Sequence, residues 1–129
     1  MRIDTQHAQP HKHHARTHRH PLWGRGQEVP GEDPLLCGRY GAHYIRGLQG
    51  LDHPGGEGVV RMAASPKHFV AYDTEGMGPN MRQGSTFAGP TFDRHNFTAR
   101  VTAQELVEYY ALPFKMAVED GGALGMMCR

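Results

Sequence analysis

Apolar side chains between residues 36 and 48 recur at every fourth position, which is the spacing of a helix with one apolar face. This stripe comprises Leu36, Tyr40, Tyr44 and Leu48, and Ile45 widens it. Just before the stripe, Asp33 is suited to the N-cap of a helix and Pro34 to its first position. A glycine, either Gly47 or Gly50, can end the helix. The pattern predicts a helix that begins at Pro34.

A second helix is predicted near the end of the sequence. Thr102 and Glu105 have the spacing of a capping box, in which each side chain bonds the backbone N–H of the other. The apolar stripe of this helix comprises Leu106, Tyr110, Phe114 and Ala117 or Val118. Pro113 should kink or divide the helix, because proline lacks the N–H that a helix interior requires. The pair Gly121 and Gly122 should stop it.

Strands are expected between and after these helices. The run 59–64 is short and mostly apolar, as in a buried strand, and 123–127 begins another. Residues 74–93, rich in Gly, Pro, Thr and Asn, form a long predicted loop. Gly38 and Gly41 would allow close packing of the first helix against a neighbouring strand. Helices that alternate with strands indicate an α/β chain with parallel strands, which needs further strands to cover its edges.

The composition changes abruptly near residue 21. Residues 1–20 hold six of the ten histidines, namely His7, His11, His13, His14, His18 and His20. Almost no large apolar side chain accompanies them, so we expect residues 1–21 to be a disordered tail. Imidazole clusters can bind transition metals, but no cysteine or carboxylate is spaced to complete a tetrahedral site. We therefore interpret this segment as low-complexity sequence and predict no metal site.

Charge and cysteine content exclude several classes of function. The formal net charge is +1, which gives no reason to expect nucleic acid or an anionic membrane as a partner. No stretch approaches the roughly 20 apolar residues of a membrane span. Cys37 and Cys128 are the only cysteines, and we expect two unpaired thiols. Nothing in the sequence points to a cofactor.

Three blocks in the sequence resemble glycoside hydrolase family 3, nearest its β-xylosidase branch. The first is WGRGQEVPGEDP (23–34), followed by RYGAHYIRGLQG (39–50). The second is SPKHFVAYD (65–73), and the third runs from DRHNF at 93 to MMC at 128. The resemblance implies that residues 22–129 are a fragment of the family's N-terminal barrel, of the triosephosphate isomerase type. Two to three β/α units of that (β/α)8 barrel would be present.

The resemblance also implies an activity for a longer parent enzyme, which hydrolyses terminal β-xylosyl or related residues of oligosaccharides with retention of configuration. Such chemistry uses two carboxyl groups about 5–5.5 Å apart. In the family, the nucleophilic aspartate follows on a later strand and the acid/base lies beyond the barrel. The family's continuation after MMC and its strand before WGR are replaced here, which suggests a partial gene product. We expect this chain to be inactive alone, and its parent to be secreted or in the cell wall.

Four residues match sugar contacts of the family: Arg25, Lys67, His68 and, less securely, Arg94. The family often holds the Lys-His pair with cis peptide geometry. We expect Lys67 and His68 at the C-terminal end of the strand that begins near Val59, where barrel enzymes place their working groups. The polar ends of Arg25, Lys67 and His68 should converge within about 10 Å.

Other interpretations of these residues remain open on the sequence alone. Arg25 could pair with Glu28 or Glu32 as a surface ion pair, and His68 could be a core histidine. We interpret Asp33 as a helix cap, not as one of a catalytic carboxylate pair. An alternative function is a non-catalytic sugar-binding protein, or a pseudogene product with a metal-binding tail.

Overall fold

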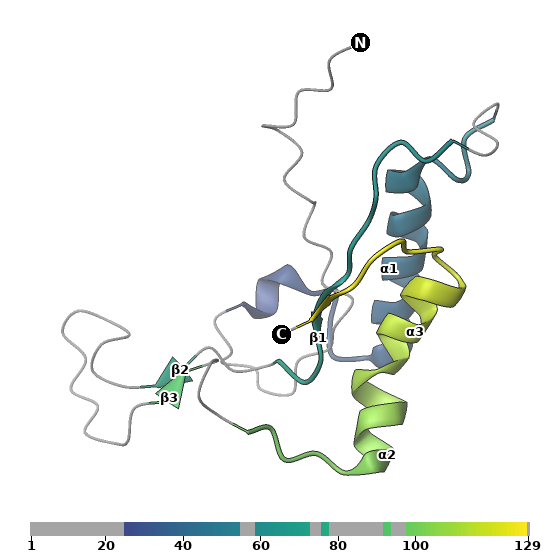
Figure 1. Ribbon diagram of the computed structural model, residues 1–129. Helices are drawn as coiled ribbons and strands as arrows, with labels where there is room; N and C mark the ends of the chain where they lie inside the picture. The colour runs from purple at the N-terminus through teal and green to yellow at the C-terminus, as the bar shows by residue number, and fades with distance from the viewer. Residues whose placement is uncertain (1–24, 55–58, 73–75, 78–91, 94–97, 129) are drawn as a thin grey trace.

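The computed structural model describes residues 25–54, 59–72, 76–77, 92–93 and 98–128. Within these ranges the chain alternates helices and short strands (Figure 1). In order, the elements are η1 (Gly26–Glu28), α1 (Pro34–Gln49), β1 (Lys67–Phe69), β2 (Gly76–Met77), β3 (Phe92–Asp93), α2 (Ala103–Glu105), η2 (Leu106–Tyr110), α3 (Leu112–Glu119) and β4 (Met127–Cys128).

The first predicted helix is confirmed in its ends and in part of its apolar stripe. Asp33 caps α1, accepting hydrogen bonds from the backbone N–H of Leu35 and Leu36, and Gly50 ends it at φ 75°. The buried residues are Cys37, Gly38, Gly41, Ala42, Ile45 and Gln49. The predicted stripe is confirmed at Ile45, which is 0% exposed, and at Leu48, which packs against the core. It is wrong at Leu36 and Tyr40, which are 52% and 50% exposed.

Close packing between two helices explains why the buried face of α1 differs in part from the apolar stripe. The glycine face of α1 lies against α3, so that a methyl group at Gly38 would overlap the sulfur of Met116. At the other end of the interface, a methyl group at Gly121 would lie 3.0 Å from Cα of Ala42. The close approach that the glycines predicted is present, but its partner is a helix and not a strand.

The second predicted helix forms as three consecutive pieces. The capping box of Thr102 and Glu105 is present, with reciprocal bonds of 3.1 and 2.8 Å. Pro113 lies in the first turn of α3, just after the π-helical turn η2, so its predicted division of the helix is confirmed. After α3 ends at Glu119, Gly122 adopts φ 68°, as expected for a helix stop.

The strands confirm an α/β chain with a parallel pair. β1 pairs with β4 in parallel, with Lys67 opposite Met127 and Phe69 opposite Cys128. The segment from α2 to α3 connects them, as a helical crossover does in a βαβ unit. The strands β2 and β3 form an antiparallel pair within the predicted loop 74–93. Residues 78–91 of that loop lie outside the described ranges.

The predicted strand at 59–64 is wrong. Val59 is 66% exposed, and no strand forms in this described run. Its backbone is held by the end of α1 instead: the N–H of Arg61 donates to the carbonyl of Gln49, and the N–H of Ala64 donates to the Gln49 side chain. The last strand also forms later than predicted, at Met127–Cys128 and not from Ala123.

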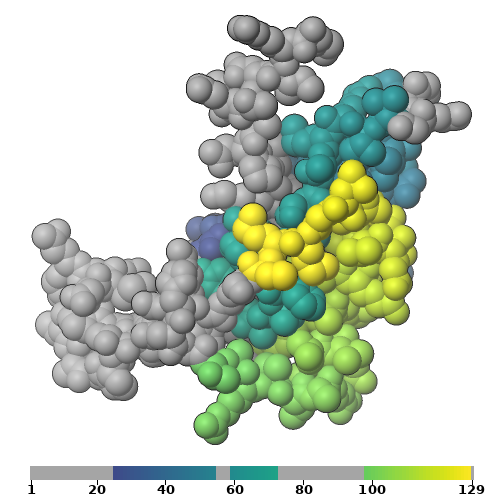
Figure 2. Space-filling view, in the orientation of Figure 1, coloured from purple at the N-terminus to yellow at the C-terminus, as the bar shows by residue number. Residues whose placement is uncertain are grey.

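The core lies between the helix pair and β1. It comprises Ile45, Ala64, Phe114 and Ala117, with Leu48, Phe69, Val70 and Ala123 packed against it. The rings of Phe69 and Phe114 meet edge to face at 5.2 Å, which ties β1 to α3. In Figure 2 the yellow C-terminal segment that contains β4 lies over the teal segment that contains β1, at the surface of this view. The parallel pair is thus packed by helices on one side.

Candidate functional site

The Lys-His pair forms the start of β1. Lys67 is its first residue and is 8% exposed, while His68 is half-buried. Both residues lie within this strand, so the expectation that they end a strand from Val59 is wrong. The peptide bonds Lys67–His68 and Phe69–Val70 are cis, and the cis geometry that the resemblance implied for this pair is present.

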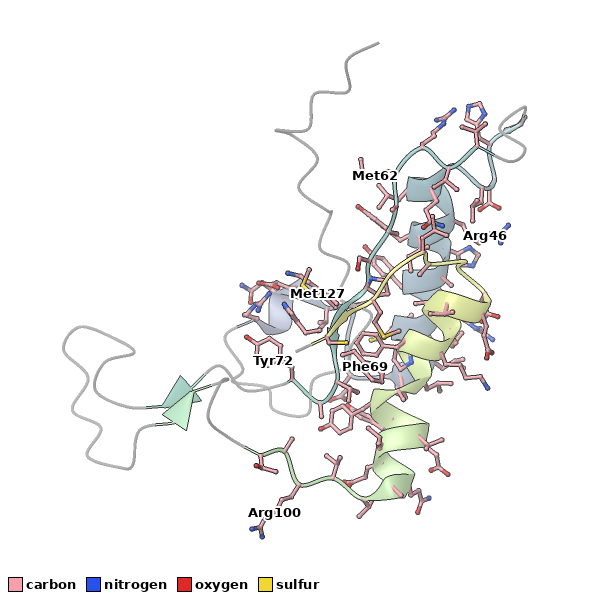
Figure 3. All side chains as sticks on the ribbon, viewed as in Figure 1. Arg46, Met62, Phe69, Tyr72, Arg100 and Met127 are labelled. Carbon is pink, nitrogen blue, oxygen red and sulfur yellow. The ribbon has the colours of Figure 1, made fainter. Side chains whose placement is uncertain are left out.

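The chain turns sharply after β1 and brings Tyr72 back beside His68. Ala71 has φ 58°, in the left-handed region that non-glycine residues seldom occupy. Tyr72 follows and is 4% exposed, and its ring meets the His68 ring edge to face, with centroids 5.2 Å apart. In Figure 3, Phe69 points toward α3, whereas Tyr72 lies on the side of η1.

Arg25 reaches Tyr72 from the loop before η1. One terminal nitrogen, Nη1, donates to the Tyr72 hydroxyl at 3.2 Å, and the guanidinium carbon lies 5.6 Å from the centre of the ring. The Nε and Nη2 groups of Arg25 donate to the two carboxylate oxygens of Glu28, at 2.8 and 2.6 Å. The hydrogen bond to Glu28 raises the pKa of Arg25, and partial burial opposes this increase. Of the two predicted ion-pair partners, Glu28 is the one observed.

The structure therefore brings Arg25 and His68 together around Tyr72, which the sequence analysis did not single out. Tyr72 comes three residues after β1 ends at Phe69, and Arg25 reaches it from outside the strand. The position of Arg25 at the C-terminal end of the strand stays a prediction. Lys67 adjoins His68 in the strand, and Arg94 lies outside the described residues. An aromatic residue four positions after His68, inside the block 65–73, was the available signal for Tyr72.

A separate pocket of about 600 Å³ opens between the start of α1 and the turn η2. Its lining comprises Glu32, Asp33, Glu105, Tyr109 and Tyr110. In the interactions described above, none of these residues contacts Arg25, His68 or Tyr72. Two of its three carboxylates are used as helix caps, those of Asp33 and Glu105. The interpretation of Asp33 as a cap is confirmed, and this pocket does not present a pair of carboxylates held for catalysis.

Other classes of site find no support in the described part of the chain. No group of three or more His, Cys, Asp or Glu residues there is arranged to hold a metal ion, and the six tail histidines lie outside it. None of the described helices is long and apolar enough to cross a membrane. Both thiols are free, as predicted, with Cys37 buried and Cys128 exposed.

No family model matches the chain. Comparison with individual known proteins does find relatives, and their names agree with one another. It is 42% identical over 113 residues to a probable β-D-xylosidase of Arabidopsis thaliana. It is 43% identical over 110 residues to a β-xylosidase/α-L-arabinofuranosidase of Medicago sativa, and 44% identical over 112 residues to a probable exo-1,4-β-xylosidase of Aspergillus clavatus. Each match covers 85% of this chain but only 12–13% of the relative.

Solved structures show the same relationship. A family 3 exo-β-xylosidase, determined with a xylobiose aziridine activity-based probe, matches 89% of this chain with a TM-score of 0.70 and 38% identity. A β-glucosidase from Erythrobacter marinus shares the fold over 91% of the chain, with a TM-score of 0.56 and 23% identity. The chain spans 13% of each of these structures. On sequence and structure together, this chain is a β-xylosidase-like segment of glycoside hydrolase family 3.

Proposed function

We propose that residues 22–129 correspond to two to three β/α units of an N-terminal (β/α)8 barrel, and that residues 1–21 are a separate tail. The parallel pair β1–β4 with its helical connection is the repeating unit of such a barrel. The helix α1 precedes β1, so the chain alternates helix and strand as the barrel does. The TM-score of 0.70 to a family 3 enzyme supports the same assignment.

The function that we propose is part of the first sugar subsite of a retaining exo-glycosidase, which acts on terminal β-xylosyl residues of oligosaccharides. The observation that carries this proposal is the contact of both Arg25 and His68 with Tyr72 beyond the end of β1. A guanidinium and an imidazole in this position can bond neighbouring hydroxyls of one pyranose ring. Lys67 and Arg94 join the subsite by resemblance alone.

The relatives' names supply the substrate class, because fold alone does not give it. The names of all three sequence relatives include β-xylosidase, one of them together with α-L-arabinofuranosidase, and the solved exo-β-xylosidase holds a xylobiose-derived probe. The proposal places the catalytic carboxylates outside these 129 residues, in a parent enzyme secreted or held in the cell wall. The chain then binds sugar without cleaving it.

Binding and turnover test this proposal separately. We expect D-xylose to bind the chain, and Arg25→Gln to weaken that binding by about tenfold, since a hydrogen bond to a charged group is lost. Arg46→Gln is the matched control, because Arg46 bonds Asp52 in an exposed ion pair much as Arg25 bonds Glu28. An aryl β-xyloside should remain uncleaved by the purified chain. Equal loss of binding in both variants, or turnover of the aryl glycoside, would contradict the proposal.

A further inference from the structure

Tyr72 is the one described side chain shown to contact both Arg25 and His68. Its hydroxyl oxygen accepts a hydrogen bond from Arg25, and its ring packs against the His68 imidazole. At 4% exposure, the tyrosine is itself held by the surrounding chain. Arg25 and His68, which are 43 residues apart in the sequence, thereby both contact the same buried tyrosine.

Glu28 alone would not fix the direction of the Arg25 guanidinium. The Arg25 and Glu28 side chains retain 20% and 32% of their exposure, so the two can move together as an exposed ion pair. The bond to Tyr72 adds a third point of attachment, from a different part of the chain, on the Nη1 group that Glu28 does not bind. Together with the two bonds to Glu28, the bond to Tyr72 helps to define the plane of the guanidinium, on which recognition of hydroxyls by this planar group depends.

The backbone before Tyr72 sets the direction of its ring. Ala71 is 6% exposed and has φ 58°, which turns the chain back toward β1 directly after the strand. The edge-to-face angle of 87° between the Tyr72 and His68 rings is a preferred geometry for aromatic pairs. The imidazole therefore has a preferred orientation before any sugar binds.

We propose that Tyr72 is a positioning residue of the sugar subsite: its hydroxyl orients Arg25 and its ring orients His68, so that both side chains can bond the hydroxyls of one pyranose. This inference rests on the proposed function for its sugar, but the orientation itself is a property of the free chain. Tyr72 then acts through Arg25 and His68 without touching the substrate.

The first test measures orientation in the full chain by NMR, without sugar. Tyr72→Phe should free the guanidinium, seen as faster rotation about the Cζ–N bonds of Arg25, and should leave the His68 ring resonances nearly unchanged. Tyr72→Leu should also move the His68 resonances, because the ring current of Tyr72 is removed. Tyr110→Phe is the matched control, a tyrosine 3% exposed in η2, and should change neither signal. A general loss of stability would not produce this pattern of separate effects.

The second test titrates D-xylose into the same variants. Tyr72→Phe should weaken binding about five- to tenfold, as expected for one lost hydrogen bond to a charged group, and Tyr110→Phe should not. In an Arg25→Gln background, Tyr72→Phe should have no further effect, because the two changes remove one coupled contact. Full additivity of the two changes would overturn the positioning role.

The two tests separate the failure of this inference from the failure of the proposed function. If D-xylose does not bind the unchanged chain, the proposed function fails, and the NMR comparison still decides whether Tyr72 orients Arg25 and His68. If Arg25 rotation is the same in the unchanged chain and in Tyr72→Phe, the inference is overturned even where D-xylose binds.

Discussion

Burial gives Cys37 a chemistry different from that of an ordinary thiol. Its side chain is 0% exposed, and its Sγ donates to the carbonyl of Gly31 at 3.2 Å. Burial is the largest effect on this group, since it disfavours the thiolate, and it raises the pKa of Cys37 from 9.0 to about 11. Folding therefore favours the neutral thiol of Cys37 over its thiolate.

This shift predicts how stability depends on alkaline pH. A group whose pKa is raised by folding contributes stability that is complete below its unfolded value, here 9.0, and lost as pH rises through about 11. We expect the free energy of unfolding to fall between pH 9 and 11, and Cys37→Ala to flatten that fall. Urea unfolding at a series of pH values measures this. The exposed Cys128→Ala is the control, and an equal flattening there would contradict the prediction.

Local signals in the sequence were sufficient for the helix caps. Asp33, Thr102 and Glu105 bond backbone groups within three residues, so their roles follow from spacing alone. The partner of Arg25 was foreseen only in part. Glu28 is three residues away, but Tyr72 is 47 residues away, and no periodic pattern connects two such positions. That contact depends on the turn at Ala71, where a non-glycine residue gives no warning of positive φ.

At the scale of elements, small residues determine how α1 and α3 pack. The apolar spacing included Leu36 and Tyr40, which are exposed, whereas the glycines of α1 are buried because they let the helix axes approach closely. Periodicity identified the helix correctly and its buried face only in part, at Ile45 and Leu48. A pattern of large side chains cannot show which face a partner helix covers when the contact is made by glycine and alanine.

Two glycine substitutions should therefore have opposite effects on stability. A methyl group at Gly121 would lie 2.6 Å from the carbonyl oxygen of Ala117 and 3.0 Å from Cα of Ala42, both backbone atoms that cannot move aside alone. We expect Gly121→Ala to destabilise the fold by about 1–3 kcal/mol, as overpacking does. Gly47→Ala, with open space around it, should stabilise α1 by about 0.5–1 kcal/mol.

Thermal unfolding followed by circular dichroism at 222 nm compares the two variants on the same helical signal. A higher midpoint for Gly121→Ala than for Gly47→Ala would contradict the close α1–α3 contact.

At the scale of the whole molecule, one buried polar side chain joins three parts of the chain. Gln49 is 0% exposed at the end of α1. Its amide nitrogen donates to the carbonyl of Gly122 at 2.8 Å, and its amide oxygen accepts from the N–H of Ala64 at 3.1 Å. The turn after α3 and the segment leading into β1 are therefore held to the same helix. The alternation of helix and strand predicted the order of these parts, but nothing local indicated that a glutamine would connect them.

Replacing this glutamine should cost more than any surface change of the same chemistry. Gln49→Leu keeps the volume but leaves the N–H of Ala64 and the carbonyl of Gly122 without their bonds inside the protein. Each buried group left unpaired costs about 1–3 kcal/mol, and the Gly122 carbonyl is only partly buried, so we expect the free energy of unfolding to fall by about 2–4 kcal/mol. Gln104→Leu is the matched control, because Gln104 bonds only Glu108 in an exposed pair among the interactions described, and a change within about 0.5 kcal/mol is expected. Urea unfolding of both variants makes the comparison.

Because Gln49 holds the segment that leads to Lys67 and His68, Gln49→Leu should also weaken D-xylose binding. A Gln49→Leu variant that unfolds easily yet binds D-xylose as well as the unchanged chain would show that the sugar contacts do not depend on this connection.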